Sequence, residues 1–162
     1  MSDNEETKTV HIDLPVDHLT LRRYTLKVLK GPDAGMERSF DRRQVFVGTS
    51  AECQFSLNDP TVSRTHARIE FDSAGYMIRD EDSKNGVLVS GLRVRNAYLP
   101  PEADIVLGET TVRFRLGNET VDISISKENR FGKMIGRSVE MREIFAMLKR
   151  VAPTDATVLI EG

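Results

Sequence analysis

The chain has 162 residues, of which 39% are hydrophobic and 30% charged, and its formal net charge is −2. A chain with this slightly acidic balance is a poor candidate for broad electrostatic binding to nucleic acid. No apolar run approaches the roughly 20 residues that cross a bilayer, and no secretory signal opens the sequence. Cys53 is the only cysteine, so no disulfide framework can form within the chain and a reducing, cytoplasmic setting is expected.

The first part of the sequence divides into a polar arm and a series of short alternating segments. Residues 1–20 are acidic, and we expect a disordered arm there. Residues 21–118 contain short runs that alternate apolar and polar side chains, with Gly, Pro, Asn, Asp or Ser between nearly every pair. Residues 67–71, with the sequence ARIEF, have the pattern of a strand with one buried face. The spacing predicts an all-β fold, an antiparallel β-sandwich of about 10–11 short strands.

The C-terminal part of the sequence changes its periodicity. Residues 121–126, VDISIS, alternate once more, as a last strand or an extended linker, and the segment KENRFGKMIGRS after them is charged and punctuated by glycine. We expect a linker over residues 119–131. After Ser138, a suitable N-cap, apolar residues follow helical spacing, and Pro153 ends the pattern. We therefore predict that residues 132–162 form a C-terminal α/β stub of one helix and one short strand. These elements are too few to enclose a core, so we expect the truncated start of a second domain.

Three loops between the predicted strands carry polar residues that hydrophobic packing does not require. Their sequences are VGTS (47–50), VSRTHARI (62–69) and DSKNGVLVSG (82–91). The Asn85-Gly86 pair is a strong turn signal by itself, because both residue types tolerate a positive φ. The other polar residues admit several roles, including a hydrolytic pair, a phosphate receptor and a plain polar loop.

Together the three loops resemble those of the forkhead-associated (FHA) domain, a β-sandwich that recognises phosphothreonine in partner proteins. The family pattern is a strand that ends in Gly-Arg, then a Ser-x-x-His motif, then a Ser/Thr-x-Asn-Gly loop. The corresponding residues here are Gly48-Thr49, Ser63-Arg64-Thr65-His66 and Ser83-Lys84-Asn85-Gly86. The resemblance extends over residues 23–116 and includes the segment LGETTVRF at residues 107–114.

The resemblance implies a role for each residue that would contact the ligand. Ser63 would donate its hydroxyl hydrogen to the phosphate, and Arg64 could add a charged donor. Asn85 would clamp the backbone of an extended peptide, because its amide both donates and accepts hydrogen bonds. Lys84 occupies the position that touches the phosphate or its threonine in the family.

Three further residues are implied to have structural roles. The histidine of the family motif braces the loop through hydrogen bonds, and here it is His66. Gly48, on which a strand ends, and Gly86, which tolerates a positive φ in the Asn-Gly turn, would be structural. We therefore expect support of the loop from His66 rather than a catalytic function.

Thr49 departs from the family pattern, because the family has a phosphate-binding arginine at this position. A threonine hydroxyl donates one hydrogen bond but brings no charge. The loss of one charged donor would cost about 2 kcal/mol, or roughly thirty-fold in affinity. The sequence offers several replacements without selecting one of them: Arg42, Arg43, Arg64 and Lys84.

Two functions from other classes compete with phosphopeptide binding. The first is a phosphate-independent module that binds other proteins or itself and controls the assembly of a larger ring, and Thr49 favours it. The second is an enzyme that acts through Ser63 and His66, but the sequence shows no orienting acid and no oxyanion donors near them. We therefore expect no enzyme activity from this chain and no metal site. We also expect no DNA binding by this chain, since no helix-turn-helix pattern is present.

Residues 131–162 resemble the start of the AAA+ ATPase domain of sigma-54-dependent transcription activators. The match consists of a Met-Ile-Gly-Arg-Ser entry, the amphipathic helix, an Ala-Pro-Thr link and a short β run. Gly162 would be the first glycine of the P-loop that cradles the phosphates of ATP. The P-loop lysine is not in this sequence, so we expect no cofactor here and ATP with Mg only in a full-length protein. An amphipathic helix docked on the sandwich is the alternative.

This second resemblance implies a bacterial, cytoplasmic signal-transduction protein. The FHA domain would regulate it by reading the product of a Ser/Thr kinase. Transcription would start through ATP-driven remodelling of sigma-54 RNA polymerase, and DNA would be bound by a further domain. A homo-oligomeric ring is the expected assembly, and no membrane partner is expected.

Overall fold

The computed structural model describes residues 18–159 and divides them between two compact units. Residues 20–122 form the first unit, and residues 123–159 belong to the second. Residues 1–17, most of the expected arm, lie outside the described residues, and so does Gly162.

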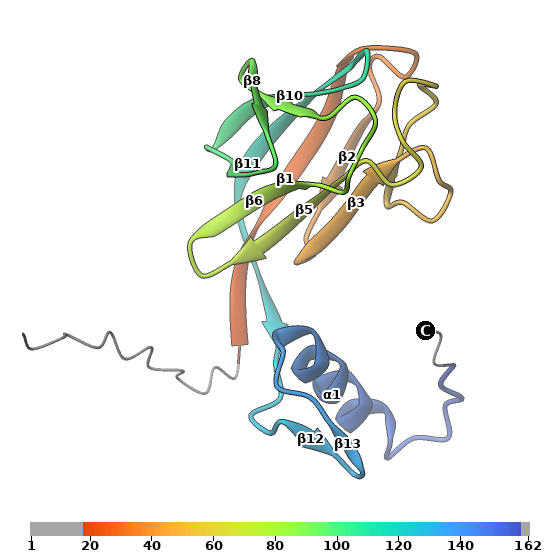
Figure 1. Ribbon diagram of the computed structural model, residues 1–162. Coiled ribbons are helices and arrows are strands. Elements are labelled where there is room, and N and C mark those ends of the chain that lie inside the picture. The colour runs from red at the N-terminus through yellow and green to blue at the C-terminus, as the bar shows by residue number, and fades with distance from the viewer. Residues whose placement is uncertain (1–17, 160–162) are drawn as a thin grey trace, which may run out of the picture. The chain divides into compact units, whose positions relative to one another are not determined.

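The first unit is a β-sandwich of two sheets (Figure 1). One sheet has six strands in the order β2-β1-β11-β10-β7-β8, and the other has five in the order β4-β3-β5-β6-β9. Most strand pairs are antiparallel, but the short strand β4 pairs with β3 in parallel. This architecture confirms the predicted all-β sandwich of 10–11 strands. The strands are β1 (His18–Lys30), β2 (Glu37–Phe40), β3 (Gln44–Gly48), β4 (Phe55–Ser56), β5 (Ala67–Asp72), β6 (Gly75–Asp80), β7 (Val87–Val89), β8 (Leu92–Val94), β9 (Asn96–Tyr98), β10 (Glu102–Leu107) and β11 (Thr110–Ser124).

The core lies between the two sheets and follows the alternation of the sequence. In β5, Ala67 and Ile69 are buried, whereas Arg68 between them is only half-buried. Rings from both sheets meet in the core, with Tyr24 and Tyr76 centroids 4.7 Å apart. Burial of each large apolar side chain contributes roughly 1.5–3 kcal/mol, so the core is the main source of stability.

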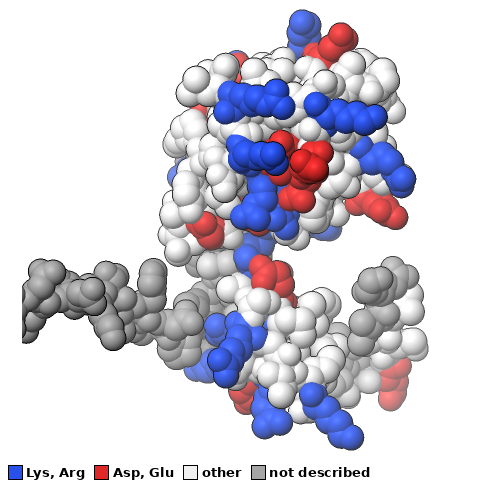
Figure 2. Space-filling view, in the orientation of Figure 1, with Lys and Arg blue, Asp and Glu red and all other residues white. Residues whose placement is uncertain are grey.

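The outer face of the five-stranded sheet carries paired charges. The Nε atom of Arg68 lies 3.2 Å from Glu81 and 3.4 Å from Glu70, and Arg79 lies 3.4 Å from Glu70. Arg68 and Glu81 form an ion pair, but their atoms are not aligned for a hydrogen bond. Figure 2 shows basic side chains around acidic ones on this face. These charges largely neutralise one another at the surface.

Strand register brings three loops to one end of the sandwich. Val47 near the end of β3 is paired with Ala67 at the start of β5, and Ala67 is paired with Asp80 at the end of β6. The segments that follow β3, precede β5 and follow β6 therefore leave the sheet at the same edge. We call residues 47–50, 61–66 and 83–86 the rim loops.

The second unit contains a short hairpin and one helix. Strands β12 (Arg130–Phe131) and β13 (Met134–Ile135) pair with each other, and helix α1 (Val139–Val151) follows. Ser138 caps the helix by accepting a hydrogen bond from the backbone N–H of Met141, as its position in the sequence predicts. The helix is not long and apolar enough to span a membrane, and the described residues contain no other helix.

Two features of the second unit differ from the expected linker and strand. Strand β11 continues to Ser124, because the alternation of the sequence continues there. The apolar run expected as a strand does not form one at residues 157–159, and residues 160–162 lie outside the described range. A strand needs a neighbouring strand to satisfy its backbone groups, and residues 157–159 have none.

Candidate functional site

Two of the rim loops are joined by hydrogen bonds that involve the predicted binding residues. The backbone N–H of Lys84 donates to the hydroxyl oxygen of Ser63 over 3.1 Å. The side-chain amide of Asn85 donates to the carbonyl oxygen of Thr61 over 2.7 Å. The structure therefore brings Ser63 and Asn85 together on adjacent loops, although 21 residues separate Ser63 from Lys84 in the sequence.

His66 lies beneath these loops and connects them from the inside. Its side chain is 0% exposed. The ring Nδ1 accepts a hydrogen bond from the backbone N–H of Ser63 at 3.0 Å, so Nε2 carries the proton and donates to the carbonyl oxygen of Gly86 at 3.0 Å. Both ring nitrogens are thus occupied, and neither is available to take a proton from the Ser63 hydroxyl. This geometry suits the bracing role and not a hydrolytic pair.

Gly48 permits the third rim loop to approach the second. A Cβ atom at this position would lie 2.1 Å from the carbonyl oxygen of Arg64. The next two residues continue the contact, since Thr49 N–H donates to Ser63 O at 3.1 Å and Ser50 N–H donates to Arg64 O at 3.0 Å. No side chain fits where the two backbones meet, so the glycine is a steric requirement of the site.

Several donors and acceptors of the rim loops remain available to a ligand. The hydroxyl of Ser63 accepts from Lys84, which leaves its hydrogen to donate. Asn85 uses one amide hydrogen, so its second N–H and its oxygen have no partner within residues 18–159. The result is a set of convergent polar groups at the end of a rigid sandwich.

The rim loops carry two cations, Arg64 and Lys84, that have no ion-pair partner within residues 18–159. The side chains of Arg64 and Lys84 are exposed, and neither makes an ion pair or hydrogen bond within the described part of the chain. Thr49 is half-buried and contributes only its hydroxyl and backbone. Arg64 directly follows Ser63 in the sequence, and the backbone N–H of Lys84 contacts the Ser63 hydroxyl, so both cations belong to residues that adjoin Ser63.

Arg42 and Arg43 do not reach the rim loops. They directly precede β3, and Gly48 lies at the opposite end of that five-residue strand. At roughly 3.3 Å per residue, the strand is longer than an arginine side chain. Arg43 also donates through Nε to the carbonyl oxygen of Phe71 at 3.2 Å. These two residues are excluded as replacements for the family arginine by their distance along the strand.

Two residues at the site were not identified from the sequence. Thr61 supplies the carbonyl oxygen that holds Asn85, and the Asp59-Pro60-Thr61 turn was the available signal. Arg93 packs its guanidinium against Gly86, where an added Cβ would lie 2.7 Å from the Nη2 atom. No local pattern signals this contact, because it depends on the pairing of β7 with β8.

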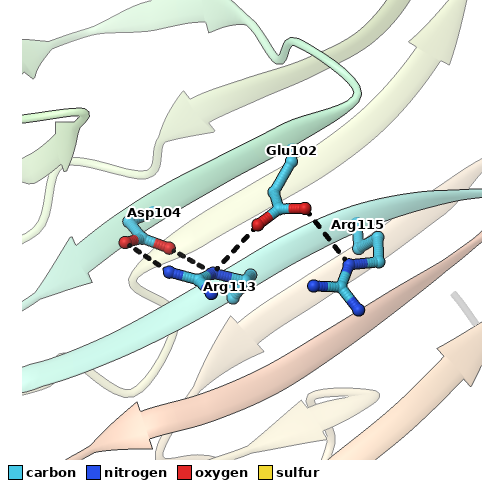
Figure 3. A network of polar contacts seen from close by, with 4 residues as sticks. All are labelled: Glu102, Asp104, Arg113 and Arg115. Carbon is cyan, nitrogen blue, oxygen red and sulfur yellow. Dashed lines mark hydrogen bonds and ion pairs between the residues drawn. The ribbon is translucent and has the colours of Figure 1, made fainter.

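A second charged cluster lies away from the rim loops, on the outer face of the six-stranded sheet (Figure 3). Arg113 contacts both oxygens of Asp104, at 2.8 and 3.0 Å, and Arg115 lies 3.3 Å from Glu102. The hydrogen bonds from Arg113 hold the pKa of Asp104 below its usual value. Because its charges are already paired, this cluster offers less to an anion than the rim loops do.

Comparison with known proteins gives matches over the sandwich. The family model described as "Inner membrane component of T3SS, cytoplasmic domain" matches residues 27–118. The glycogen accumulation regulator GarA of Mycolicibacterium smegmatis is 29% identical over 97 residues, which are 60% of this chain and 61% of that protein. The chain therefore spans less than two thirds of that relative's length.

Two further matches cover more of the known protein. The oxoglutarate dehydrogenase inhibitor of Corynebacterium glutamicum is 30% identical over 112 residues, which are 68% of this chain and 78% of the relative. A solved structure from an analysis of phosphothreonine-dependent FHA domain interactions has a TM-score of 0.54 and 26% identity. That match covers 60% of this chain and 99% of the known one.

Proposed function

The chain belongs, through residues 27–118, to the family described as the cytoplasmic domain of an inner-membrane T3SS component and contains an FHA domain, and from this premise we propose that it binds phosphothreonine in a partner protein. One observation carries the proposal. The Ser63 hydroxyl and the Asn85 amide are held on adjacent rim loops by hydrogen bonds of 3.1 and 2.7 Å, with donors left over for a ligand.

Phosphate chemistry explains why these groups suit a phosphothreonine. The phosphorylated side chain carries close to two negative charges and three acceptor oxygens. Ser63 donates its hydroxyl hydrogen, and Arg64 and Lys84 supply the positive charge that Thr49 does not. Each charge-assisted hydrogen bond contributes roughly 1.5–3 kcal/mol, so two or three are enough for micromolar affinity. Asn85 then binds the peptide backbone beside the phosphate.

The names of the matched relatives support a regulatory role rather than an enzymatic one. One relative is a regulator of glycogen accumulation and another is an inhibitor of oxoglutarate dehydrogenase. The solved FHA domain comes from work on interactions that depend on phosphothreonine. We carry this dependence to the present chain together with a Ser/Thr kinase as the source of the modified partner.

A titration with a degenerate phosphothreonine peptide library and its unphosphorylated counterpart tests the proposal. We expect the phosphorylated library to bind at least about tenfold more tightly, and Ser63→Ala to remove most of that preference. Thr49→Arg should strengthen phosphate-dependent binding, since it adds the missing charged donor. Arg115→Gln, on the paired sheet face, is the matched control and should bind like the wild type. Equal binding of the two libraries to the wild type would overturn the proposal.

Thr49 favours a second candidate, a phosphate-independent module that binds another copy of the chain. The uncharged residue lowers the expected affinity for phosphate by one charged donor. Sedimentation velocity of the wild type and Ser63→Ala discriminates between the two candidates. An oligomer that forms in both proteins without any phosphopeptide would favour self-association.

The wider role that we propose is the sensory domain of a cytoplasmic, sigma-54-dependent transcription activator. The resemblance of residues 131–162 to the start of the AAA+ domain supports it, and α1 falls where that resemblance requires a helix. A full-length protein would bind ATP and Mg, remodel RNA polymerase and contact DNA through further domains. ATP hydrolysis by the full-length protein, with and without the phosphothreonine library, tests this role. No hydrolysis under either condition would contradict it.

A further inference from the structure

A buried carboxylate lies beneath the rim loops. Asp59 is 1% exposed, and its Oδ1 atom accepts hydrogen bonds from the backbone N–H of Thr61 at 2.8 Å and from the Thr61 hydroxyl at 2.6 Å. Its Oδ2 atom accepts from the hydroxyl of Thr110 at 2.7 Å. Thr110 is itself 0% exposed and begins β11. Three donors satisfy this buried charge, and two of them belong to Thr61, so Asp59 and Thr61 are fixed against each other.

Thr61 connects the buried carboxylate of Asp59 to the rim loops at the surface. Its hydroxyl donates to Asp59 and accepts from the backbone N–H of Glu109 at 2.8 Å, so its rotation is fixed from two sides. The turn that contains Gly108 packs directly on it, since a Cβ on Gly108 would lie 2.2 Å from the Thr61 hydroxyl oxygen. The carbonyl oxygen of Thr61 then accepts from the Asn85 amide at 2.7 Å.

We infer that Asp59 and Thr61 are positioning residues that set the orientation of the Asn85 amide, an inference that rests on the proposed function. A carbonyl oxygen can only accept, so the NH₂ group of Asn85 must face Thr61. The oxygen and the second N–H of Asn85 are thereby left for a peptide backbone, which offers one donor and one acceptor per residue. Asp59 is buried and acts through Thr61, and Thr61 acts through its carbonyl contact with Asn85.

A purely structural role for Asp59 makes a different prediction from a positioning role. Thr110→Val removes one hydrogen bond to Asp59 but leaves the contacts of Thr61 with Asp59, Glu109 and Asn85 unchanged. Thr61→Val removes the hydroxyl that anchors Thr61 while keeping its shape and its carbonyl. Thr110→Val loses one hydrogen bond and Thr61→Val loses two, and only the second variant loosens the residue that holds Asn85.

The first measurement is made on the protein without peptide. NMR of the Asn85 side-chain amide should show a hydrogen-bonded N–H in the wild type and in Thr110→Val. In Asp59→Asn and Thr61→Val we expect that resonance to move toward the free-amide position, and Thr61→Ser, which restores the hydroxyl, should return it. This measurement needs no ligand, so it tests the positioning even where phosphopeptide binding itself fails.

The second measurement is affinity for the phosphothreonine library. We expect about tenfold weaker binding for Thr61→Val and Asp59→Asn, and wild-type binding for Thr110→Val and Thr61→Ser. The inference is overturned when Asn85 keeps its hydrogen-bonded resonance in folded Thr61→Val. It is also overturned when the resonance moves but affinity does not. Absence of phosphate preference in the wild type contradicts the proposed function and leaves the NMR result to decide the positioning.

Discussion

The rim loops and the outer face of the six-stranded sheet both carry arginines, but they use them differently. On the sheet, Arg113 lies directly opposite Asp104 in the strand register, and each neutralises the other. On the rim loops, Arg64 and Lys84 have no carboxylate partner within residues 18–159. The register of two paired strands places Arg113 beside its carboxylate partner. The cations on the rim loops have no such partner among the described residues and remain available to an anion from solvent. Unpaired charges therefore indicate an anion-binding site better than the total number of charges on a surface does.

The largest effect is expected from Gly48→Ala, which would disrupt the rim loops while leaving the sheet face intact. The added methyl would collide with the backbone of Arg64, 2.1 Å away, and neither backbone can yield easily. We expect a loss of roughly 3 kcal/mol in unfolding free energy, measured by denaturant titration. Gly91→Ala is the control, because nothing lies within 4 Å of its added Cβ and only its φ of +83° causes strain. That strain costs about 1–2 kcal/mol, so equal losses for the two variants would contradict the steric account.

His66→Phe tests whether the rim loops depend on hydrogen bonds inside the domain. The ring keeps most of the volume, but Ser63 N–H and Gly86 O lose their partners. We expect a cost of roughly 2 kcal/mol in denaturant unfolding. Tyr76→Phe, which removes a single hydrogen bond of 2.6 Å to the carbonyl of Arg22, should cost about half as much. A His66→Phe variant as stable as the wild type would show that the brace is dispensable.

The stability of the wild type and of Asp59→Asn, measured as a function of pH, compares a buried carboxylate with the exposed ones. Burial alone would raise the pKa of Asp59, but hydrogen bonds from Thr61 and Thr110 hold it below its usual value. A lowered pKa means that the carboxylate stabilises the fold above the unfolded value of about 4 and loses this effect as pH falls through the folded value. We expect Asp59→Asn to be less stable by about 1–2 kcal/mol at neutral pH. The difference should shrink below about pH 4, and a difference that does not change with pH would contradict this assignment.

The smallest effect is expected from Arg113→Gln on the sheet face. Exposed ion pairs contribute little because water and salt screen them. The unfolding midpoint should stay close to that of the wild type, and affinity for the phosphothreonine library should not change. Raised ionic strength should weaken phosphopeptide binding in both proteins. A large loss of affinity in Arg113→Gln would move the functional surface from the rim loops to the sheet.

Local patterns in the sequence predicted the sandwich, because alternation and turn residues act within a few positions. They also predicted α1 from its cap and its apolar spacing. The hairpin of β12 and β13 was missed, since its strands have two residues each and leave almost no periodic signal. The alternation of residues 121–126 allowed either a last strand or an extended linker, because the segment alone does not show whether a neighbouring strand pairs with it. The structure continues β11 as a strand to Ser124.

The candidate site was less accessible to sequence reasoning than the fold. Ser63 and Asn85 could be named because each stands at a position of the FHA motifs that the loops resemble. The contacts of Thr61 and Arg93 could not, because they depend on which loops and strands become neighbours. The sequence offered four cations as replacements for the family arginine and could not select among them. The structure excludes Arg42 and Arg43, because they precede β3 and Gly48 lies at its opposite end.

Amide chemical-shift mapping by NMR with a phosphothreonine peptide tests most directly that the rim loops take the phosphate. We predict that the largest shifts fall on the backbone amides of residues 47–50, 61–66 and 83–86, and that β10 and β11 shift little. The unphosphorylated peptide should leave all of them nearly unchanged. Equal shifts with both peptides, or shifts centred on Arg113 and Arg115, would contradict the account.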